Sequence, residues 1–179
     1  NSDPMHPMKR YAGEALGPNP HIVVLGSCKV GNFVISTPVL RGLKSRFPDA
    51  VIGFIGSELT ADFEEALHEI NWRASWDKQD AHAGMNLIRR IDDFKSLHGD
   101  ITLAVNLDGF NPVTCTILPW LHPHFVSGGS LKSNMRSSMP WGEDPQQRFL
   151  ADKDWDSPDF LARYEGVFES NYIASLFCH

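Results

Sequence analysis

Long apolar segments, secretory signals and cysteine pairs are all missing from this sequence. No uninterrupted apolar run approaches the roughly 20 residues of a membrane-spanning helix, and the chain does not open with a charged, apolar and small-residue secretory pattern. Its three cysteines, Cys28, Cys115 and Cys178, are widely spaced and form no Cys-x-x-Cys pair. We therefore expect a cytoplasmic protein with reduced thiols, without a disulfide framework or a metal site.

An excess of basic residues is missing as well. The chain has 16 Lys and Arg against 22 Asp and Glu, a formal net charge of −6. Nucleic-acid binding therefore lacks its usual electrostatic basis, a basic face. The 179 residues, of which 42% are hydrophobic and 21% charged, have the size and composition of one globular domain.

The sequence does contain a regular alternation of short β-branched runs and amphipathic stretches. The runs predict strands at 21–25, 50–55, 73–76, 101–107 and 124–126, and the stretches predict helices at 33–46, 58–70, 86–97 and 113–121. In the second helix, four residues are expected to face inward: Leu59, Phe63, Ala66 and Leu67. The alternation indicates an α/β, Rossmann-like parallel sheet with helices on both faces. We expect the first strand to lie between the second and the fourth.

The two ends of the chain depart from this alternation. Residues 1–20 are rich in Pro and Gly and predict a flexible arm, whose first four residues look like a vector-derived remnant. The predicted domain covers 21–157, with a long loop at 127–156. A helix over 158–179 is expected to follow the start signal Ser157-Pro158-Asp159. Leu161, Tyr164, Phe168, Tyr172 and Leu176 give it an apolar side.

The loop from Gly26 to Asn32 is the first candidate site. It follows the first predicted strand and opens a helix, for which Asn32 is a good N-cap residue, so its N–H groups suit an anion or a polar ligand. Gly26 and Gly31 have the spacing of a P-loop, but Asn32 and Phe33 replace its Lys and hydroxyl. The middle glycine of the dinucleotide fingerprint is absent. A plain tight β–α turn therefore stays open as an alternative.

Asp108 is the second candidate. It follows the strong predicted strand at 101–107, and the carboxyl ends of the first and fourth strands would flank the crevice where such sheets bind ligands. The alternative is a simple Asp108-Gly109 turn. Several other polar residues are interpreted as structural, surface or solvated-loop groups without a functional role: His68, His82, His98, His122, His124, Lys132, Arg136 and Arg148. Lys29 and the basic residues of the long loop could also contact a phosphate.

Two segments resemble glycosyltransferase family 9, which includes the ADP-heptose:lipopolysaccharide heptosyltransferases. The stretch 23–54 has that family's strand, glycine-containing loop, Thr37-Pro38-Val39-Leu40 helix start and Phe47-Pro48-Asp49-Ala50 step before a second strand. The stretch 99–110 resembles its later Asp-x-x-Ile-Asp-Leu segment. The similarity fades after about residue 126.

The resemblance implies the acceptor-side, N-terminal half of a GT-B fold. It implies inverting, metal-independent transfer of a sugar, such as heptose, from a nucleotide-diphosphate donor to a saccharide or lipid-linked acceptor, with no further cofactor. Association with the inner membrane would be peripheral, in lipopolysaccharide biosynthesis. The donor-binding C-terminal half is absent from this chain, which we therefore expect to be inactive alone.

The sequence departs from the family pattern at Asn32. The resemblance implies an acid there as catalytic base, and an amide cannot accept the proton. We therefore take Asn32 as an orienting residue and Asp108 as the replacement base. The candidate substrate-binding residues are Gly26, Ser27, Lys29, Gly31 and Thr37. The acidic charge favours an acceptor less anionic than a lipopolysaccharide core. A non-catalytic sugar- or nucleotide-binding module is the alternative function.

Overall fold

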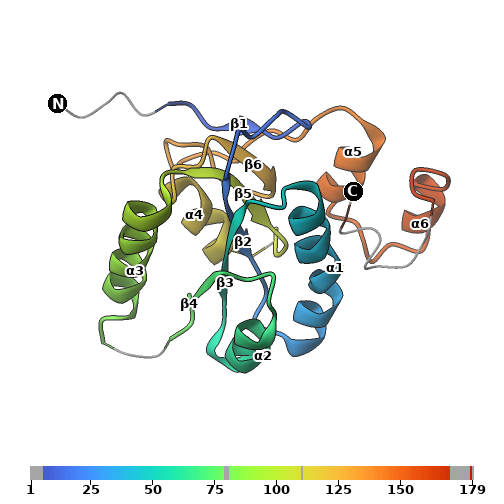
Figure 1. The fold of residues 1–179 in the computed structure, drawn as a ribbon. Helices are drawn as coiled ribbons and strands as arrows, with labels where there is room; N and C mark the ends of the chain where they lie inside the picture. The colour runs from blue at the N-terminus through green and yellow to red at the C-terminus, as the bar shows by residue number, and fades with distance from the viewer. Residues whose placement is uncertain (1–5, 79–80, 110, 170–177, 179) are drawn as a thin grey trace.

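The computed structural model describes residues 6–78, 81–109, 111–169 and 178, and these contain a six-stranded parallel sheet. Across the sheet the strands run β1-β6-β5-β2-β3-β4 (Figure 1). Their bounds are β1 Lys9–Arg10, β2 His21–Leu25, β3 Val51–Gly56, β4 Trp72–Ser75, β5 Ile101–Asn106 and β6 Phe125–Gly128. The expected central position of the first predicted strand is confirmed, because β2 pairs with β3 on one side and β5 on the other.

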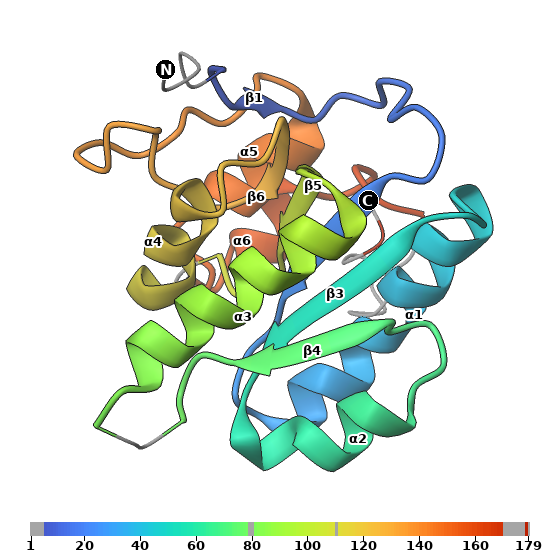
Figure 2. The same cartoon turned by 60° about the vertical axis from the view of Figure 1, so that its left-hand side comes forward.

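Helices cover both faces of this sheet. They are α1 Val30–Arg46, the 3-10 turn η1 Glu58–Thr60, α2 Ala61–Ala66, α3 Ala83–His98, α4 Pro112–Trp120, α5 Pro145–Ala151 and α6 Phe160–Arg163. Figure 2 shows α3 and α4 on one face and α1 on the other. Every residue of β2 is buried, and successive side chains enter opposite layers. Val23 and Leu25 join one core cluster, while Ile22 and Val24 join the other.

The N-terminal segment corrects the expectation of a loose arm. Lys9–Arg10 form β1, because the Lys9 N–H donates to His124 O at 3.0 Å and the Tyr11 N–H to Val126 O at 2.9 Å. Leu16 is buried in the core beside α1. The segment therefore covers the outer edge of β6, which would otherwise present unpaired backbone groups. Residues 1–5 lie outside the described part of the chain.

The segment after β3 is the clearest error of the helix prediction. The helix expected at 58–70 is the short turn η1 followed by α2, which ends at Ala66. Leu59 and Phe63, expected to face inward, have 68% and 50% of their surface exposed, whereas Glu64 is fully buried. The buried position belongs to a carboxylate because Glu64 pairs with Arg73 of β4.

The chain after β6 also differs from the prediction. The predicted loop at 127–156 contains α5, and the expected last helix is the four-residue α6. Phe149 of α5 contacts the rings of Phe160 and Tyr164, which holds α5 against α6. Tyr172 and Leu176 lie outside the described residues. None of the described helices has the length and apolar character needed to cross a bilayer.

A buried histidine anchors the amino-terminal edge of the sheet. The Nδ1 of His21 lies 2.9 Å from Gly99 O, and its Nε2 lies 3.0 Å from the Trp72 indole nitrogen. A carbonyl can only accept and an indole N–H can only donate, so His21 is neutral with its proton on Nδ1. Burial lowers the pKa of His21 below its ordinary value, which agrees with this neutral form.

Candidate functional site

The candidate site lies where the strand order reverses. From β2 the chain continues outward through β3 and β4, and then returns to β5 on the other side of β2. The last residues of the two central strands, Leu25 and Asn106, are register partners. The loop at 26–32 and Asp108 therefore follow the carboxyl-terminal ends of two adjacent strands, on the same side of the sheet. Open parallel sheets bind ligands at such a split.

The loop after β2 is anchored at its first residue and open beyond it. The Gly26 N–H donates to Ile55 O at 3.0 Å, and a Cβ on Gly26 would lie 2.4 Å from Cζ of Phe54. Only glycine therefore fits at the head of the loop. Lys29, Gly31 and Asn32 are exposed, so the loop is accessible to a ligand.

Hydrogen bonds within this loop determine which of its polar atoms can donate and which can accept. The Ser27 Oγ accepts from the Lys29 N–H at 3.1 Å and from the Asn32 side-chain amide at 3.0 Å. With both lone pairs occupied, the Ser27 hydroxyl has its own proton to donate. No described residue donates to Asn32 Oδ1. The loop therefore offers a neutral donor and a neutral acceptor side by side.

Helix α1 begins earlier than the sequence indicates. It starts at Val30, so the N-cap is Lys29 rather than Asn32, and no side chain caps it. The first-turn N–H groups are consequently available, and the positive end of the helix dipole lies in the loop. Thr37 lies about two turns beyond the start of α1, where its hydroxyl donates to Val34 O at 2.9 Å. That bond lies within α1, so the Thr37 hydroxyl does not join the hydrogen-bonded group of Ser27, Lys29 and Asn32.

Asp108 is half-buried in a tight turn that begins helix α4. Its Oδ2 accepts from the Asn111 side chain at 2.9 Å, and its backbone N–H donates to Asn106 Oδ1 at 3.0 Å. The Asn111 N–H closes the turn on Asp108 O. Asp108 thus has the structural role that the turn interpretation gives it. Its other carboxylate oxygen has no partner among the described residues, so it can still accept a proton.

Cys115 lies near Asp108 without the character of a nucleophile. Its Sγ contacts Gly109 O at 3.1 Å. Burial, and then the negative charge of Asp108, raise the pKa of the Cys115 thiol. A raised pKa keeps the thiol protonated near neutral pH, and the thiolate is the reactive form.

Two glycines at the end of β6, Gly128 and Gly129, form the wall beside Asp108. Gly128 has φ +89°, and a Cβ on Gly129 would lie 2.3 Å from Gly109 O. The Asn106 side chain ties these loops together by donating to Gly129 O at 2.7 Å. The sequence analysis did not select these residues, although a Gly128-Gly129 pair one residue beyond the predicted strand at 124–126 is a signal of close backbone approach.

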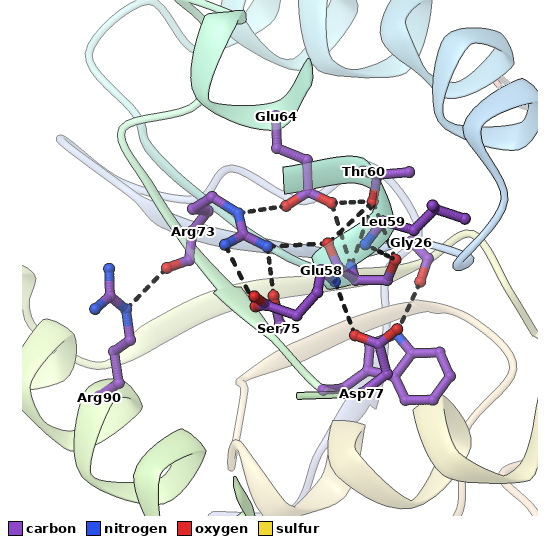
Figure 3. A network of polar contacts seen from close by, with 11 residues as sticks. Gly26, Glu58, Leu59, Thr60, Glu64, Arg73, Ser75, Asp77 and Arg90 are labelled. Atoms are coloured by element: carbon purple, nitrogen blue, oxygen red, sulfur yellow. Dashed lines mark hydrogen bonds and ion pairs between the residues drawn. The ribbon is translucent and has the colours of Figure 1, made fainter. Parts of the chain in front are cut away.

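A second polar cluster missed by the sequence analysis lies at the ends of β3 and β4 (Figure 3). Glu64 and Arg73 form an ion pair at 2.6 Å, with side chains 0% and 14% exposed. The Ser57 N–H donates to Glu64 at 3.3 Å, and Arg73 donates to Ser57 O at 3.1 Å. A carboxylate on a predicted amphipathic helix reads as a surface residue, so the sequence gives no sign of this burial.

The remaining polar candidates stay at the surface. Lys132, Arg136, His122 and His124 are exposed. Arg148, also exposed, pairs with Glu143 at 3.3 Å. Within the described ranges, no three His, Cys, Asp or Glu side chains are grouped as metal ligands.

Comparison with known proteins identifies the fold. No family model matches the chain, and no curated protein matches it. The chain is similar to the crystal structure of the glycosyl transferase family 9 from Veillonella parvula DSM 2008, with a TM-score of 0.53 and 19% sequence identity. The match covers 85% of this chain and 42% of that chain, so this chain spans less than half of its length. The expected α/β, Rossmann-like fold class is thereby confirmed, and the partial cover is consistent with one half of a GT-B fold.

Proposed function

We propose that this chain is the acceptor-binding half of a glycosyltransferase. The observation that supports it best is the open, polar loop at 26–32, placed at the strand-order reversal of a fold shared with a family 9 structure. The enzyme would be inverting and independent of metal, and would act in the cytoplasm on a nucleotide-sugar donor. A second half of the same protein would bind that donor.

The proposed chemistry requires an acceptor hydroxyl held between two strand ends. The hydroxyl oxygen attacks the anomeric carbon from the face opposite the leaving group, so the configuration inverts. The bond from that carbon to the nucleotide diphosphate breaks, and the hydroxyl proton moves to Asp108 as general base. Ser27 and Asn32 orient the acceptor, and fixing its geometry supplies proximity.

The loop also suggests what kind of acceptor it holds. Its donor and acceptor, the Ser27 hydroxyl and Asn32 Oδ1, are neutral and suit the hydroxyl groups of a sugar. Lys29 is the exposed cation of the loop and is available for one phosphate. We therefore favour a saccharide or lipid-linked acceptor with few charges. Heptose transfer and lipopolysaccharide biosynthesis remain within this proposal.

The role of Asp108 is testable in the full-length protein that carries this chain. A screen of nucleotide sugars for thermal stabilisation first identifies the donor, because ligands that bind only the folded state raise its stability. Asp108→Asn should then lower kcat by roughly 10²- to 10⁴-fold, the usual contribution of a general base. The exposed Asp49, at the opposite edge of the sheet, gives the matched control Asp49→Asn. Parental turnover in Asp108→Asn rules out the base.

A non-catalytic sugar- or nucleotide-binding module is the second candidate. It is favoured by the amide at position 32 and by the engagement of Asp108 in its own turn. Under this alternative, sugars or nucleotide sugars stabilise the protein, while neither transfer nor hydrolysis of the donor is detected. The thermal screen and the transfer assay together separate the two candidates.

A further inference from the structure

A buried ion pair stands beside the proposed site without belonging to it. Glu64 of α2 is fully buried, and both of its carboxylate oxygens are occupied. Arg73 and Thr60 donate to it from their side chains, and Ser57 donates from its backbone. The arginine also donates to Ser57 O and Ser75 Oγ. The pair therefore holds the Ser57 backbone at both its N–H and its carbonyl.

Stability alone is a poor explanation for such a pair. Desolvating two charges is costly, and replacing buried pairs by packed apolar residues is often neutral or stabilising. The neighbouring backbone is nonetheless shaped around this carboxylate. A Cβ on Gly56 would lie 1.9 Å from Glu64 Oε1, so the strand end must be glycine for Glu64 to reach its place. What the pair supplies is a fixed geometry at the ends of β3 and β4.

That geometry extends to the loop after β2 (Figure 3). The Trp76 N–H, directly after β4, donates to Gly56 O at 3.0 Å. The Glu58 N–H donates to Asp77 at 2.9 Å, which ties the two loops together again. The Trp76 indole N–H then donates to Gly26 O at 3.4 Å. Gly26 is thus held by β3 through its N–H and by the segment after β4 through its carbonyl.

We propose that Arg73, fixed by Glu64, is a positioning residue for the ligand loop at 26–32, and that the Trp76 indole transmits its effect to Gly26. Neither residue touches the ligand in this arrangement. Arg73 fixes the ends of β3 and β4 through Ser57 and Ser75. The Trp76 indole N–H then connects these strand ends to the Gly26 carbonyl. The consequence for acceptor binding rests on the proposed function, whereas the ordering of the loop does not.

Hydrogen exchange of this chain, followed by mass spectrometry, tests the last link of the path. Trp76→Phe removes the indole N–H and keeps a ring in the core. Loss of one ordinary hydrogen bond should speed exchange of the hydrogen-bonded amides of this segment, Gly26, Lys29 and Phe33, about threefold to tenfold, with β6 unaffected. Trp120→Phe is the matched control, because Trp120 packs against the same core cluster and lies on α4. Unchanged exchange at 26–33 in Trp76→Phe overturns the proposal.

A second set of variants tests the origin of the path. Arg73→Lys keeps one charge near Glu64 and loses the planar fork that reaches Ser57 and Ser75, so it should loosen the 26–33 segment by a similar factor. Arg89→Met, at an exposed position of α3, is the control. If Arg73→Lys speeds exchange equally in every strand, the pair has only a general structural role and the positioning role is wrong.

Activity measurements separate this proposal from the proposed function. In the full-length enzyme, Trp76→Phe should raise the KM for the acceptor by the same threefold to tenfold, and leave the donor KM unchanged. A loosened loop in a protein that transfers no sugar supports the positioning role and refutes the transferase. Active sugar transfer in Trp76→Phe, with unchanged hydrogen exchange at 26–33 and an unchanged acceptor KM, supports the transferase and refutes the positioning role.

Discussion

Gly56→Ala gives the sharpest test of the structure around the buried ion pair. Gly56 ends β3, and an added methyl group would lie 1.9 Å from Glu64 Oε1 and 2.8 Å from Cε1 of Phe54. Phe54 is fully buried and its ring packs edge-on against Phe33, so it has little freedom to move. The carboxylate must therefore leave its position.

The expected cost follows from the bonds that the displaced carboxylate loses. Glu64 Oε1 accepts from the Ser57 N–H and the Thr60 hydroxyl, and hydrogen bonds to charged groups contribute about 1.5–3 kcal/mol each. Partial retention of these bonds reduces the loss. Alanine also restricts the unfolded chain, which returns about 0.4–1 kcal/mol. We expect Gly56→Ala to lower the free energy of unfolding by about 2–4 kcal/mol.

Urea denaturation measures this change, with Gly42→Ala as the control. A Cβ on Gly42, exposed on α1, meets no atom within 4 Å. The same substitution should therefore raise stability by about 0.5–1 kcal/mol in the control. With an m-value of about 2 kcal/mol/M, Gly56→Ala should lower the urea midpoint by roughly 1–2 M. A midpoint for Gly56→Ala at or above that of the parent would refute the placement of Glu64 against this strand end.

Three further outcomes are expected. Because the folded pKa of His21 is lowered, the unfolded chain binds the extra proton; urea stability should be level above about pH 6.5 and fall below it by up to about 1.4 kcal/mol per pH unit. His21→Gln should reduce that slope, and an equal slope in both proteins would refute the assignment. Gly129→Ala should destabilise by about 1–3 kcal/mol, because its methyl would meet backbone at Gly109 O; unchanged urea unfolding would show that the loops are apart. Asn32→Asp places a carboxylate in the first turn of α1 and should raise both the melting temperature and the transfer rate; a lower rate in a stabilised protein would show that an acid at position 32 cannot act as a base in this site.

The central sheet was predictable because its signal is local. The buried strand at 21–25 consists of apolar, largely β-branched residues after His21, and the strong strand at 101–107 has the same character. Strands that alternate with helices leave few ways of connecting a parallel sheet, so the neighbours of β2 followed from general rules. The placement of Asn32 and Asp108 at one edge followed from that order.

The edge strand β1 and the buried carboxylate were not predictable in the same way. Lys9–Arg10 pair with β6 through backbone groups, which are the same in every residue except proline. No side-chain pattern therefore predicts this strand. Leu59 and Phe63 have the spacing of an inward helix face, yet they are exposed. Their place is taken by Glu64, whose burial depends on Arg73, nine residues later in the sequence. Such a pairing is a tertiary property that periodicity does not encode.

The amide side chain of Asn32 determines what the loop itself can do. An amide whose Nδ2 donates to Ser27 presents a neutral oxygen, which can accept a hydrogen bond but cannot serve as a general base. Under the proposed function, a base must then come from a neighbouring strand end, and Asp108, two residues after the end of β5, is the proposed one. In the proposed reaction, the orienting residue and the base lie on different strand ends, so the rate would depend on the relative placement of those two ends. Under the proposed function, the contacts that fix Gly26 and the Gly129–Asn106 bond are therefore requirements of catalysis as well as of folding.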